Sequence, residues 1–477
     1  MNAPLEVLSL SAPEPSPYAF DVEVRGSAPR AVRRAFQVTG PAPDGGSRVT
    51  REYTLPVPDQ AAYLDLFEAL AEDFGIRLPL SRRPPPAAED HPGVRPLLTQ
   101  ALSPDILYGY GDPSVLRVGQ GAAAVWWLVC TSNDAPDAFP VLLSRDLVEW
   151  THAGFIFPRG HAPAWALTGA DVSDFWAPEM HRVADEFWVC FAAREHDRGL
   201  AIGMARGPRP EGPFEPDPEP LVGGGVIDPH IVLDAAGSPW LFWKKDDNDL
   251  WPRLLCDLLH RRGGVDALFE NEADRRTAAL LQTLWPWVRT LEPMEQFFVQ
   301  QPLIEAVTAE FSAFGDRLRS GAIADGERCA ILDALKTRVY AQQLAPDGRS
   351  LVGERAVVLE NDQPWEAHLI EGVWVTAHAG RYYMLYAGND FSTPHYGLGA
   401  AVADHLLGPY RKLDGPLLRT TGSWAGPGHP SVALGPDGRH HMFLHAFFPG
   451  TAAYKAFRAL LTAPLELDGD RVRVPPA

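Results

Sequence analysis

Cysteine, long apolar runs and basic charge are all in short supply in this 477-residue sequence. Its four cysteines, Cys130, Cys190, Cys256 and Cys329, form no CxxC pair, and their spacing fits neither a zinc site nor a disulfide framework. No run approaches the roughly eighteen apolar residues of a membrane-spanning helix, so no membrane partner is expected. Acidic residues outnumber basic residues by 61 to 42, which argues against a nucleic-acid partner.

The sequence also lacks a visible export signal. Its start, Met1-Asn-Ala-Pro-Leu-Glu, has no basic stretch followed by an apolar one. We interpret the four cysteines as buried, reduced thiols and predict a cytoplasmic protein. The balance of 46% hydrophobic and 22% charged residues is typical of a globular protein with a large core.

What is present is a repeated pattern. In five segments a polar residue opens a β-rich run, a turn with Gly or Asp follows, and an aromatic-rich strand comes next. The opening residues are Asp112, Glu179, Asp228, Glu371 and His429. Five copies of one unit predict an all-β, five-bladed β-propeller, in which the opening residues converge at one end of the central channel.

The spacing of these residues locates an insertion. The step from Asp228 to Glu371 is 143 residues, whereas the other steps are 49 to 67 residues. An apolar stripe from Leu303 to Leu318 within this step has the spacing of an amphipathic helix. We therefore place a helical insertion at 249–336, inside blade three, and assign 104–248 and 337–477 to the propeller. The insertion is also the predicted surface for a homo-oligomer.

Two regions precede the propeller. Residues 1–80 predict a small α/β region, with a helix that begins at Asp59 and ends at Gly75. Residues 81–103 form a proline-rich linker.

Three of the opening residues supply the carboxylates that glycoside hydrolysis requires. One protonated carboxyl group donates to the leaving oxygen, and one ionised carboxylate takes a proton from water. A third carboxylate can raise the pKa of the acid by like-charge repulsion. Asp112, Asp228 and Glu371 provide this set, while Trp176 and Trp374 are candidates to stack on a sugar face. Glu179 is interpreted as structural.

An ordered set of motifs resembles glycoside hydrolase family 43. The motifs are Asp112-Pro-Ser, Ser144-Arg-Asp-Leu-Val-Glu-Trp150, Phe175-Trp-Ala-Pro-Glu179, Ile227-Asp-Pro-His230 and Ile370-Glu-Gly372. The resemblance covers about 104–248 and 337–470 and implies inverting hydrolysis of arabinose- or xylose-containing glycans on a five-bladed propeller.

This resemblance also implies residue roles. Asp112 matches the general base, Asp228 the carboxylate that raises the pKa of the acid, and Glu371 the general acid. Trp176 and Ala177 match residues beside the terminal-sugar subsite. His429 matches an axial histidine that in some members accompanies a structural calcium, often through water; no cofactor is required. We find no match for the basic residue that several members place over the terminal sugar from a late blade.

The leading hypothesis is an exo-acting, inverting glycosidase that releases terminal α-L-arabinofuranosyl or β-D-xylosyl residues from short oligosaccharides. Short substrates are expected because polymers do not enter cells. Two alternatives stay open: a non-catalytic carbohydrate-binding propeller, and a retaining, fructosidase-like enzyme with Asp112 as nucleophile. Retention requires carboxyl groups about 5–5.5 Å apart, against roughly 6.5–9.5 Å for inversion.

Overall fold

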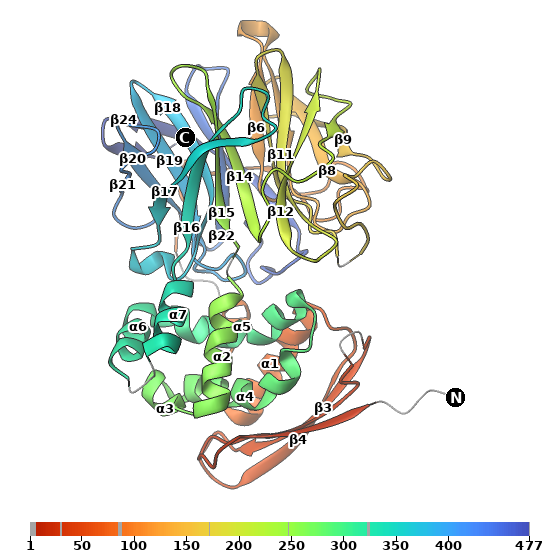
Figure 1. Ribbon diagram of the computed structural model, residues 1–477, viewed down its shortest axis with the longest axis vertical. Coiled ribbons are helices and arrows are strands. Elements are labelled where there is room, and N and C mark those ends of the chain that lie inside the picture. The colour runs from red at the N-terminus through yellow and green to blue at the C-terminus, as the bar shows by residue number, and fades with distance from the viewer. Residues whose placement is uncertain are drawn as a thin grey trace. The chain divides into compact units, whose positions relative to one another are not determined.

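The computed structural model describes residues 6–28, 31–83, 88–170, 172–246, 248–321 and 325–476. The chain divides into two compact units, of which one comprises 1–84 and 247–336 and the other 85–246 and 337–477 (Figure 1). Within the described residues, no helix has both the length and the apolar character to cross a membrane. Cys130, Cys190 and Cys256 are buried as expected, but Cys329 is exposed, so that part of the prediction is wrong.

The larger unit consists of antiparallel sheets whose strands follow one another in chain order. The first sheet contains β6 (Ser114–Val118), β7 (Val125–Val129), β8 (Ala138–Ser144) and β9 (Trp150–Phe157). The second contains β10 (Trp176–Val183), β11 (Glu186–Arg194), β12 (Leu200–Gly207) and β13 (Glu215–Pro216). The third contains β14 (Val226–Leu233), β15 (Pro239–Lys245), β16 (Arg338–Leu344) and β17 (Leu351–Glu360).

Two more sheets complete the larger unit. The fourth contains β18 (Ile370–His378), β19 (Arg381–Gly388), β20 (Gly397–Ala403) and β21 (Arg411–Lys412). The fifth contains β22 (Ala425–Leu434), β23 (His440–Phe447), β24 (Arg458–Asp468) and β25 (Arg471–Arg473), and β5 (Arg95–Leu98) pairs with β24. Short 3₁₀ helices lie at η2 (Gly121–Ala123) and η3 (Pro364–Glu366).

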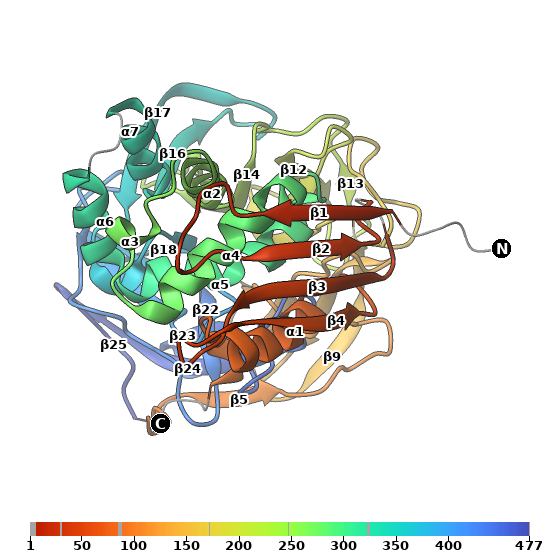
Figure 2. The same cartoon turned by 90° about the horizontal axis from the view of Figure 1, so that it is seen from below.

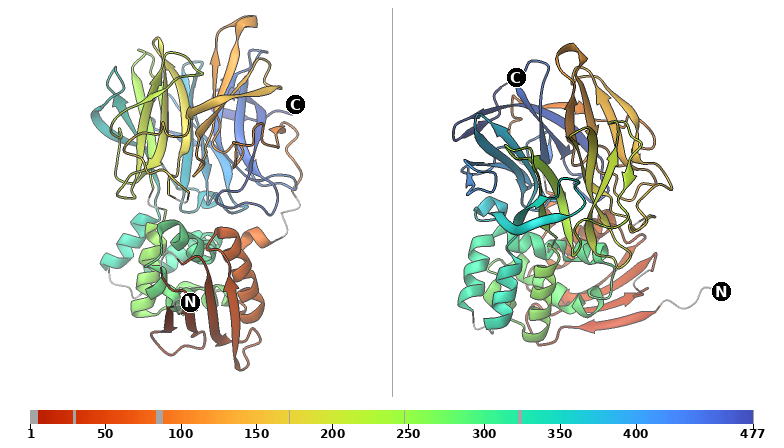
Figure 3. Two further views of the ribbon diagram at one scale, coloured as in Figure 1. Left: turned by 90° about the vertical axis from the view of Figure 1, so that its right-hand side faces the viewer. Right: turned by 45° about the horizontal axis from the view of Figure 1, so that its top comes forward.

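The first strands of these sheets contact one another in a closed order. β6 contacts β10, β10 contacts β14, β14 contacts β18, β18 contacts β22, and β22 contacts β6. Apolar side chains fill the space between neighbouring sheets; Phe139, Phe157 and Phe191, for example, pack together between the first and second sheets. Burial of such surface, at about 25 cal/mol per Å², holds the sheets face to face. This is the arrangement of a β-propeller, seen from two further sides in Figure 3.

A repeated backbone irregularity marks the beginning of these first strands. Asp112, Ala177, Asp228, Gly372 and His429 all have φ between 44° and 55°. In β10, β14, β18 and β22 the pairing with the second strand shifts register at this point. A left-handed backbone at a residue other than glycine costs about 1–3 kcal/mol, and such strain gathers at functional sites. Three of the five residues are predicted site residues with polar side chains.

The smaller unit combines strands and helices from two distant chain segments. Figure 2 shows its sheet, formed by β1 (Val7–Ser11), β2 (Asp21–Arg25), β3 (Arg34–Pro41) and β4 (Arg48–Leu55). The first segment also contains α1 (Gln60–Phe74) and η1 (Leu80–Arg82). The second segment contains α2 (Leu250–Arg262), α3 (Val265–Leu268), α4 (Glu272–Val288), α5 (Pro293–Ala309), α6 (Phe311–Ser320) and α7 (Asp325–Ala334). The sequence predicts two separate regions here, whereas the two segments fold into one unit.

Two local predictions concern helices of this unit. The predicted helix after Asp59 is confirmed, because Asp59 accepts a hydrogen bond from the backbone N–H of Ala62 and Gly75 ends α1 at φ 65°. The stripe from Leu303 to Leu318 is not one continuous helix, because the backbone breaks at Glu310, between α5 and α6. Helices α2 to α7 lie in sequence between β15 and β16, two strands that pair with each other in the third sheet.

Candidate active site

The three predicted carboxylates lie at the irregular beginnings of first strands. Asp112 precedes β6, Asp228 lies in β14 and Glu371 lies in β18. Asp228 and Glu371 are 8% and 9% exposed, and the Asp112 side chain is 12% exposed. Because water is almost excluded from these side chains, their charges act on one another strongly.

Asp112 is surrounded by donors and cationic groups. Arg458 donates from Nη1 to Oδ1 at 2.8 Å, and the Thr131 hydroxyl donates to Oδ2. The Asp112 backbone N–H donates to Nδ1 of His445 at 3.0 Å, and Nδ1 of His429 lies 3.4 Å from Oδ1. Burial alone would raise the pKa of Asp112, but Arg458 and the two imidazoles hold this pKa well below its usual range. Asp112 is therefore ionised, as a general base must be.

Asp228 is fixed by the backbone beside Glu371. Its Oδ2 accepts a hydrogen bond from the Gly372 N–H at 2.8 Å. Burial raises the pKa of Asp228 to about 7; the Lys244 ammonium opposes this rise and the Asp112 carboxylate adds to it. Asp228 thus interacts with both other carboxyl groups: Asp112 raises the pKa of Asp228, and Asp228 raises the pKa of Glu371.

Glu371 is held at both oxygens. The Tyr396 hydroxyl donates to Oε1 at 2.9 Å, and Nζ of Lys244 lies 3.4 Å from Oε2. Burial raises the pKa of Glu371 to about 7, against the effect of Lys244 and with a contribution from Asp228. The environments of Asp112 and Glu371 therefore push their pKa values apart, which is the pattern of a base and an acid that work together.

Trp176 and Ala177 begin β10, and Ala177 is linked to Asp112 through one hydroxyl group. The backbone N–H of Ala177 donates at 2.8 Å to Oγ1 of Thr131, the same hydroxyl that donates to Asp112. Trp176 is partly exposed and packs edge-on against Tyr454, with the ring centres 6.4 Å apart. The second sheet thus contacts Asp112 indirectly, through the Ala177 backbone and the Thr131 hydroxyl.

The structure does not support a sugar-stacking role for Trp374. This residue is 9% exposed and belongs to an apolar core cluster. Its ring packs against His181 and His230, at centre distances of 5.9 Å and 4.8 Å. The prediction fails because Trp374 lies two residues beyond the left-handed Gly372, where the side chain points into the core.

Glu179 forms a buried hydrogen-bond network with two histidines. Its Oε2 accepts from Nε2 of His181 at 2.9 Å and from Nδ1 of His230 at 2.7 Å. The Val375 backbone N–H donates to Nε2 of His230, so the ring hydrogen of His230 sits on Nδ1. Burial lowers the pKa of His230 to about 3, which keeps this ring neutral. These bonds join β10, β14 and β18, in agreement with a structural role for Glu179.

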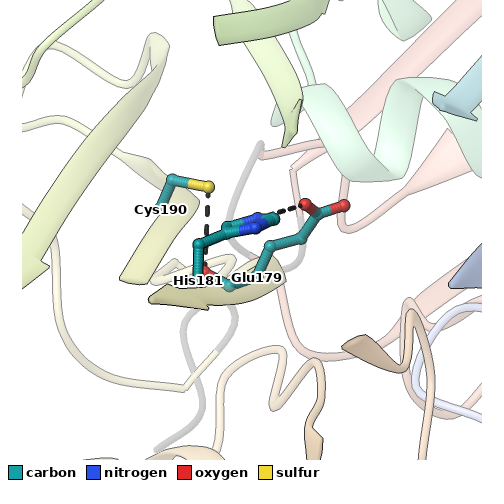
Figure 4. A group of neighbouring side chains, drawn as sticks. All are labelled: Glu179, His181 and Cys190. Carbon is teal, nitrogen blue, oxygen red and sulfur yellow. Dashed lines mark hydrogen bonds and ion pairs between the residues drawn. The ribbon is translucent and has the colours of Figure 1, made fainter. Parts of the chain in front are cut away.

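Glu179, His181 and Cys190 are also the one group of metal-type donors that lies together in the described residues (Figure 4). Figure 4 shows these donors engaged with one another: His181 bonds the Glu179 carboxylate, and Cys190 donates its S–H to the Glu179 carbonyl oxygen at 3.8 Å. Burial raises the pKa of Cys190 well above its usual value, so the thiolate that would bind a metal is disfavoured. We assign no metal to this group.

The surroundings of His429 do not fit the calcium that the resemblance suggests. Calcium takes about six to eight oxygen ligands in proteins. The carboxylate closest to the His429 ring is Asp112, and both of its oxygens already accept hydrogen bonds from Arg458 and Thr131. The neighbouring guanidinium would also repel a cation. Calcium at His429 stays a prediction, and the contacts of this ring do not favour it.

Sequence reasoning missed several residues that contact the carboxylates: Thr131, Lys244, Tyr396, His445 and Arg458. Arg458 opens β24 in the last sheet and is a basic side chain beside Asp112 that no motif indicated. A usable signal existed for two of the five, because Lys244 and His445 each directly follow a run of apolar and aromatic residues in their strands.

Comparisons with known proteins identify relatives of this chain. The model for glycosyl hydrolases family 43 matches residues 103–263 and 325–471, which is more than half of the chain and includes all three carboxylates. Xylosidase/arabinosidase 43A from Humicola insolens is 38% identical over 68 residues. That alignment covers 14% of this chain and 21% of the relative, so the similar stretch spans about a fifth of that protein.

Solved structures agree in fold. A thermostable family-43 glycoside hydrolase is 25% identical, with a TM-score of 0.52 over 77% of this chain and 92% of that chain. An endo-1,4-β-xylanase from Bacteroides thetaiotaomicron shares the fold at 17% identity, with a TM-score of 0.51 over 78% and 96% of the two chains. The match of the family model over both propeller segments shows that this chain belongs to glycosyl hydrolases family 43.

Proposed function

We propose that the protein is an inverting exo-glycoside hydrolase that releases terminal α-L-arabinofuranosyl or β-D-xylosyl residues from short oligosaccharides. The observation that carries this proposal is the contrast between Asp112, whose pKa lies well below its usual range, and Glu371, whose pKa is raised to about 7. Near neutral pH one buried carboxylate accepts protons while the other still holds one, as single-step hydrolysis requires.

In the proposed reaction, Asp112 takes a proton from a water molecule as the water oxygen attacks the anomeric carbon. The bond from that carbon to the leaving oxygen breaks, and Glu371 donates its proton to this oxygen. Arg458 and Thr131 hold the Asp112 carboxylate through one oxygen each. Asp228 binds the Gly372 N–H and raises the pKa of Glu371, which keeps the acid protonated.

The proposed scaffold is a five-bladed propeller with helices inserted in its third blade. The closed contact order of β6, β10, β14, β18 and β22 supports five blades. The pairing of β15 with β16 on either side of the helices supports an insertion within one blade. The exo action on short oligosaccharides rests on the predicted cytoplasmic location, and a homo-oligomer through the helices stays a prediction.

The test is hydrolysis of aryl α-L-arabinofuranoside and aryl β-D-xyloside by wild type, Asp112→Asn and Glu371→Ala. We expect wild type to hydrolyse at least one glycoside, and Asp112→Asn to be slower by about 10²–10⁴-fold. Glu371→Ala should lose less on these substrates, because an aryl leaving group needs little protonation. Asp414→Asn and Glu354→Gln are matched controls, since both side chains are exposed.

The anomeric form of the first product separates the alternatives. Inversion gives the opposite anomer in NMR spectra taken early in the reaction, and retention, as in the fructosidase-like alternative, gives the same anomer. Sugar binding without turnover by wild type would identify a binding propeller instead. Internal cleavage products from polymeric arabinan would contradict exo action.

A further inference from the structure

Two buried side chains from different parts of the chain contact the Glu371 carboxyl group. Tyr396, directly before β20, is 2% exposed and donates to Oε1 at 2.9 Å. Lys244, in β15, has a side chain that is 1% exposed and places Nζ 3.4 Å from Oε2. Each oxygen of the proposed acid therefore has its own neighbour.

Burying the Lys244 side chain costs free energy, which favourable interactions of its charge must offset. A buried ammonium group loses the hydration that it has in water, and this penalty is several kcal/mol unless partners offset it. In β15 the residues before Lys244 are apolar or aromatic and the residue after it is the exposed Lys245, so an apolar side chain would suit the buried Lys244 position better. Nζ lies 3.4 Å from Glu371 and 3.8 Å from Asp246, and its charge also lowers the pKa values of Asp228 and Asp390.

The ring of Tyr396 is fixed by its surroundings. His445 stacks on it at 6.2 Å between ring centres, with 14° between the planes. On another side lies Gly428, where an added Cβ would stand 1.8 Å from Cε1 of Tyr396. Burial raises the pKa of Tyr396 well above its usual value, so the hydroxyl keeps its proton and acts as a donor. The hydroxyl cannot turn away from Glu371 without moving this packed ring.

We propose that Lys244 and Tyr396 are positioning residues that decide which oxygen of Glu371 delivers the proton. Since Oε1 accepts the Tyr396 hydrogen bond, the acidic proton sits on Oε2, and Oε2 donates it to the leaving oxygen. The Lys244 ammonium then stabilises the negative charge that appears on the carboxylate as the proton leaves. This inference rests on the proposed function, in which Glu371 is the general acid.

The charged groups around Glu371 predict how its pKa responds to substitution. Burial raises the pKa; Lys244 from β15, the Tyr396 hydroxyl and His429 from β22 lower it, and Asp228 from β14 raises it. Removing the ammonium or the hydroxyl takes away one lowering effect while the raising effects remain. The pKa of Glu371 should therefore rise further in Lys244→Met and in Tyr396→Phe.

The experiment compares two substrates that differ in their need for an acid. Wild type, Lys244→Met and Tyr396→Phe are assayed on a 4-nitrophenyl glycoside, whose leaving group is good, and on the matching disaccharide, whose leaving group is poor. We expect both variants to lose roughly 10–100-fold in kcat on the disaccharide, a sizeable part of general-acid catalysis, and much less on the nitrophenyl glycoside. The alkaline limb of kcat/KM should move to higher pH in both.

Matched controls separate positioning from a general loss of packing. Lys245→Met removes a lysine charge at the next, exposed position of β15, and Tyr383→Phe removes a buried hydroxyl that donates to the Gly469 carbonyl. Both controls should keep the wild-type pH profile. Lys244→Arg, which keeps the charge, should retain the alkaline limb nearer to its wild-type position than Lys244→Met does.

Equal losses on both substrates with an unmoved alkaline limb would overturn the inference and leave the proposed function intact. If Lys244→Met fails to fold, Tyr396→Phe still decides, because it removes one oxygen atom and leaves the ring in place. Wild type without turnover on either substrate would overturn the proposed function and this inference together.

Discussion

Among single residues, Thr131 connects two parts of the site through one hydroxyl group. This oxygen accepts the Ala177 N–H at 2.8 Å and donates its own hydrogen to Asp112. A hydrogen bond to a charged group contributes about 1.5–3 kcal/mol, and a buried N–H without an acceptor costs a similar amount. Thr131 therefore orients both Asp112, the proposed base, and the strand that carries Trp176.

We predict that Thr131→Val lowers kcat/KM by roughly 10–100-fold, the equivalent of one such hydrogen bond. Valine has the shape of threonine without the hydroxyl, so packing is preserved. Thr131→Ser keeps the hydroxyl and should retain most of the activity. Thr451→Val, which removes a hydroxyl that donates to the Phe448 carbonyl on an exposed loop, is the control. Wild-type rates in Thr131→Val would contradict this role.

The raised pKa of Glu371 also predicts a pH dependence. Activity should fall as pH rises through about 7, because Glu371 and Asp228 both have pKa values raised to about 7 and the acid loses its proton there. The limb belongs to the pair rather than to either residue alone. Asp112, with its lowered pKa, stays ionised in this range and adds no limb near neutral pH.

The raised pKa of Glu371 also predicts how the stability of the fold changes with pH. Folded Glu371 keeps its proton above the usual value of 4.5, so the free energy of unfolding falls as pH rises from about 4.5 to about 7. Glu371→Gln cannot ionise, and its unfolding free energy should fall less over this range. Urea unfolding at several pH values measures both slopes, and equal slopes would show that Glu371 titrates normally.

Among elements, the first strands are joined by side chains that accept backbone hydrogen bonds from the next sheet. Ser114 accepts from the Met180 N–H at 3.3 Å, and Ser431 accepts from the Val115 N–H at 3.2 Å. His230 accepts in the same way from Val375 at 2.9 Å. Each acceptor lies two residues after a residue with left-handed φ. The irregular strand beginnings are thus tied to one another around the ring.

We predict that Ser114→Ala and Ser431→Ala each lower the free energy of unfolding by about 1–3 kcal/mol, because each leaves a buried N–H without its acceptor. Thermal and urea unfolding would measure the loss. Ser350→Ala, at an exposed position, is the control and should stay within about 0.5 kcal/mol of wild type. Losses no larger than that of the control would mean that water or nearby groups replace the serine oxygens.

The sequence reveals the repeated strands, but it does not show at which residue each backbone irregularity lies. The polar openers Asp112, Asp228 and His429 coincide with the left-handed residues, but Glu179 comes two residues after Ala177 and Glu371 comes one residue before Gly372. A polar residue in the sequence therefore indicates that a strand irregularity is near, but it does not identify which residue has the left-handed φ. For the same reason Trp374 was expected in the pocket and lies in the core. Thr131 and Arg458 belong to other strands or loops, which no local pattern relates to Asp112.

Over the whole molecule, the family match leaves residues 1–102 unassigned, and the part of them up to residue 84 forms a unit together with the inserted helices. Arg34 of β3 donates to both oxygens of Glu295 of α5, at 2.8 Å and 2.7 Å, across 261 positions of the sequence. Tyr63 of α1 donates to the same carboxylate at 2.6 Å. The sequence could not predict that the two segments form one unit, because neither Arg34 nor Glu295 lies in a motif that indicates its partner.

Breaking this ion pair should unfold the smaller unit selectively. Arg34 has no exposed side-chain surface and Glu295 has 7%, so removing one partner takes away the counter-ion of a buried charge, at a cost of about 3–5 kcal/mol. We predict that Arg34→Met and Glu295→Leu each destabilise the unit by this amount. The double variant should lose less than the sum of the two, because neither charge then remains. Hydrogen exchange of the α5 amides reports this unit separately from the propeller strands. Additive losses in the double variant would show that Arg34 and Glu295 act independently, with Arg34 held by the Gly26 and Ala28 carbonyls rather than by Glu295.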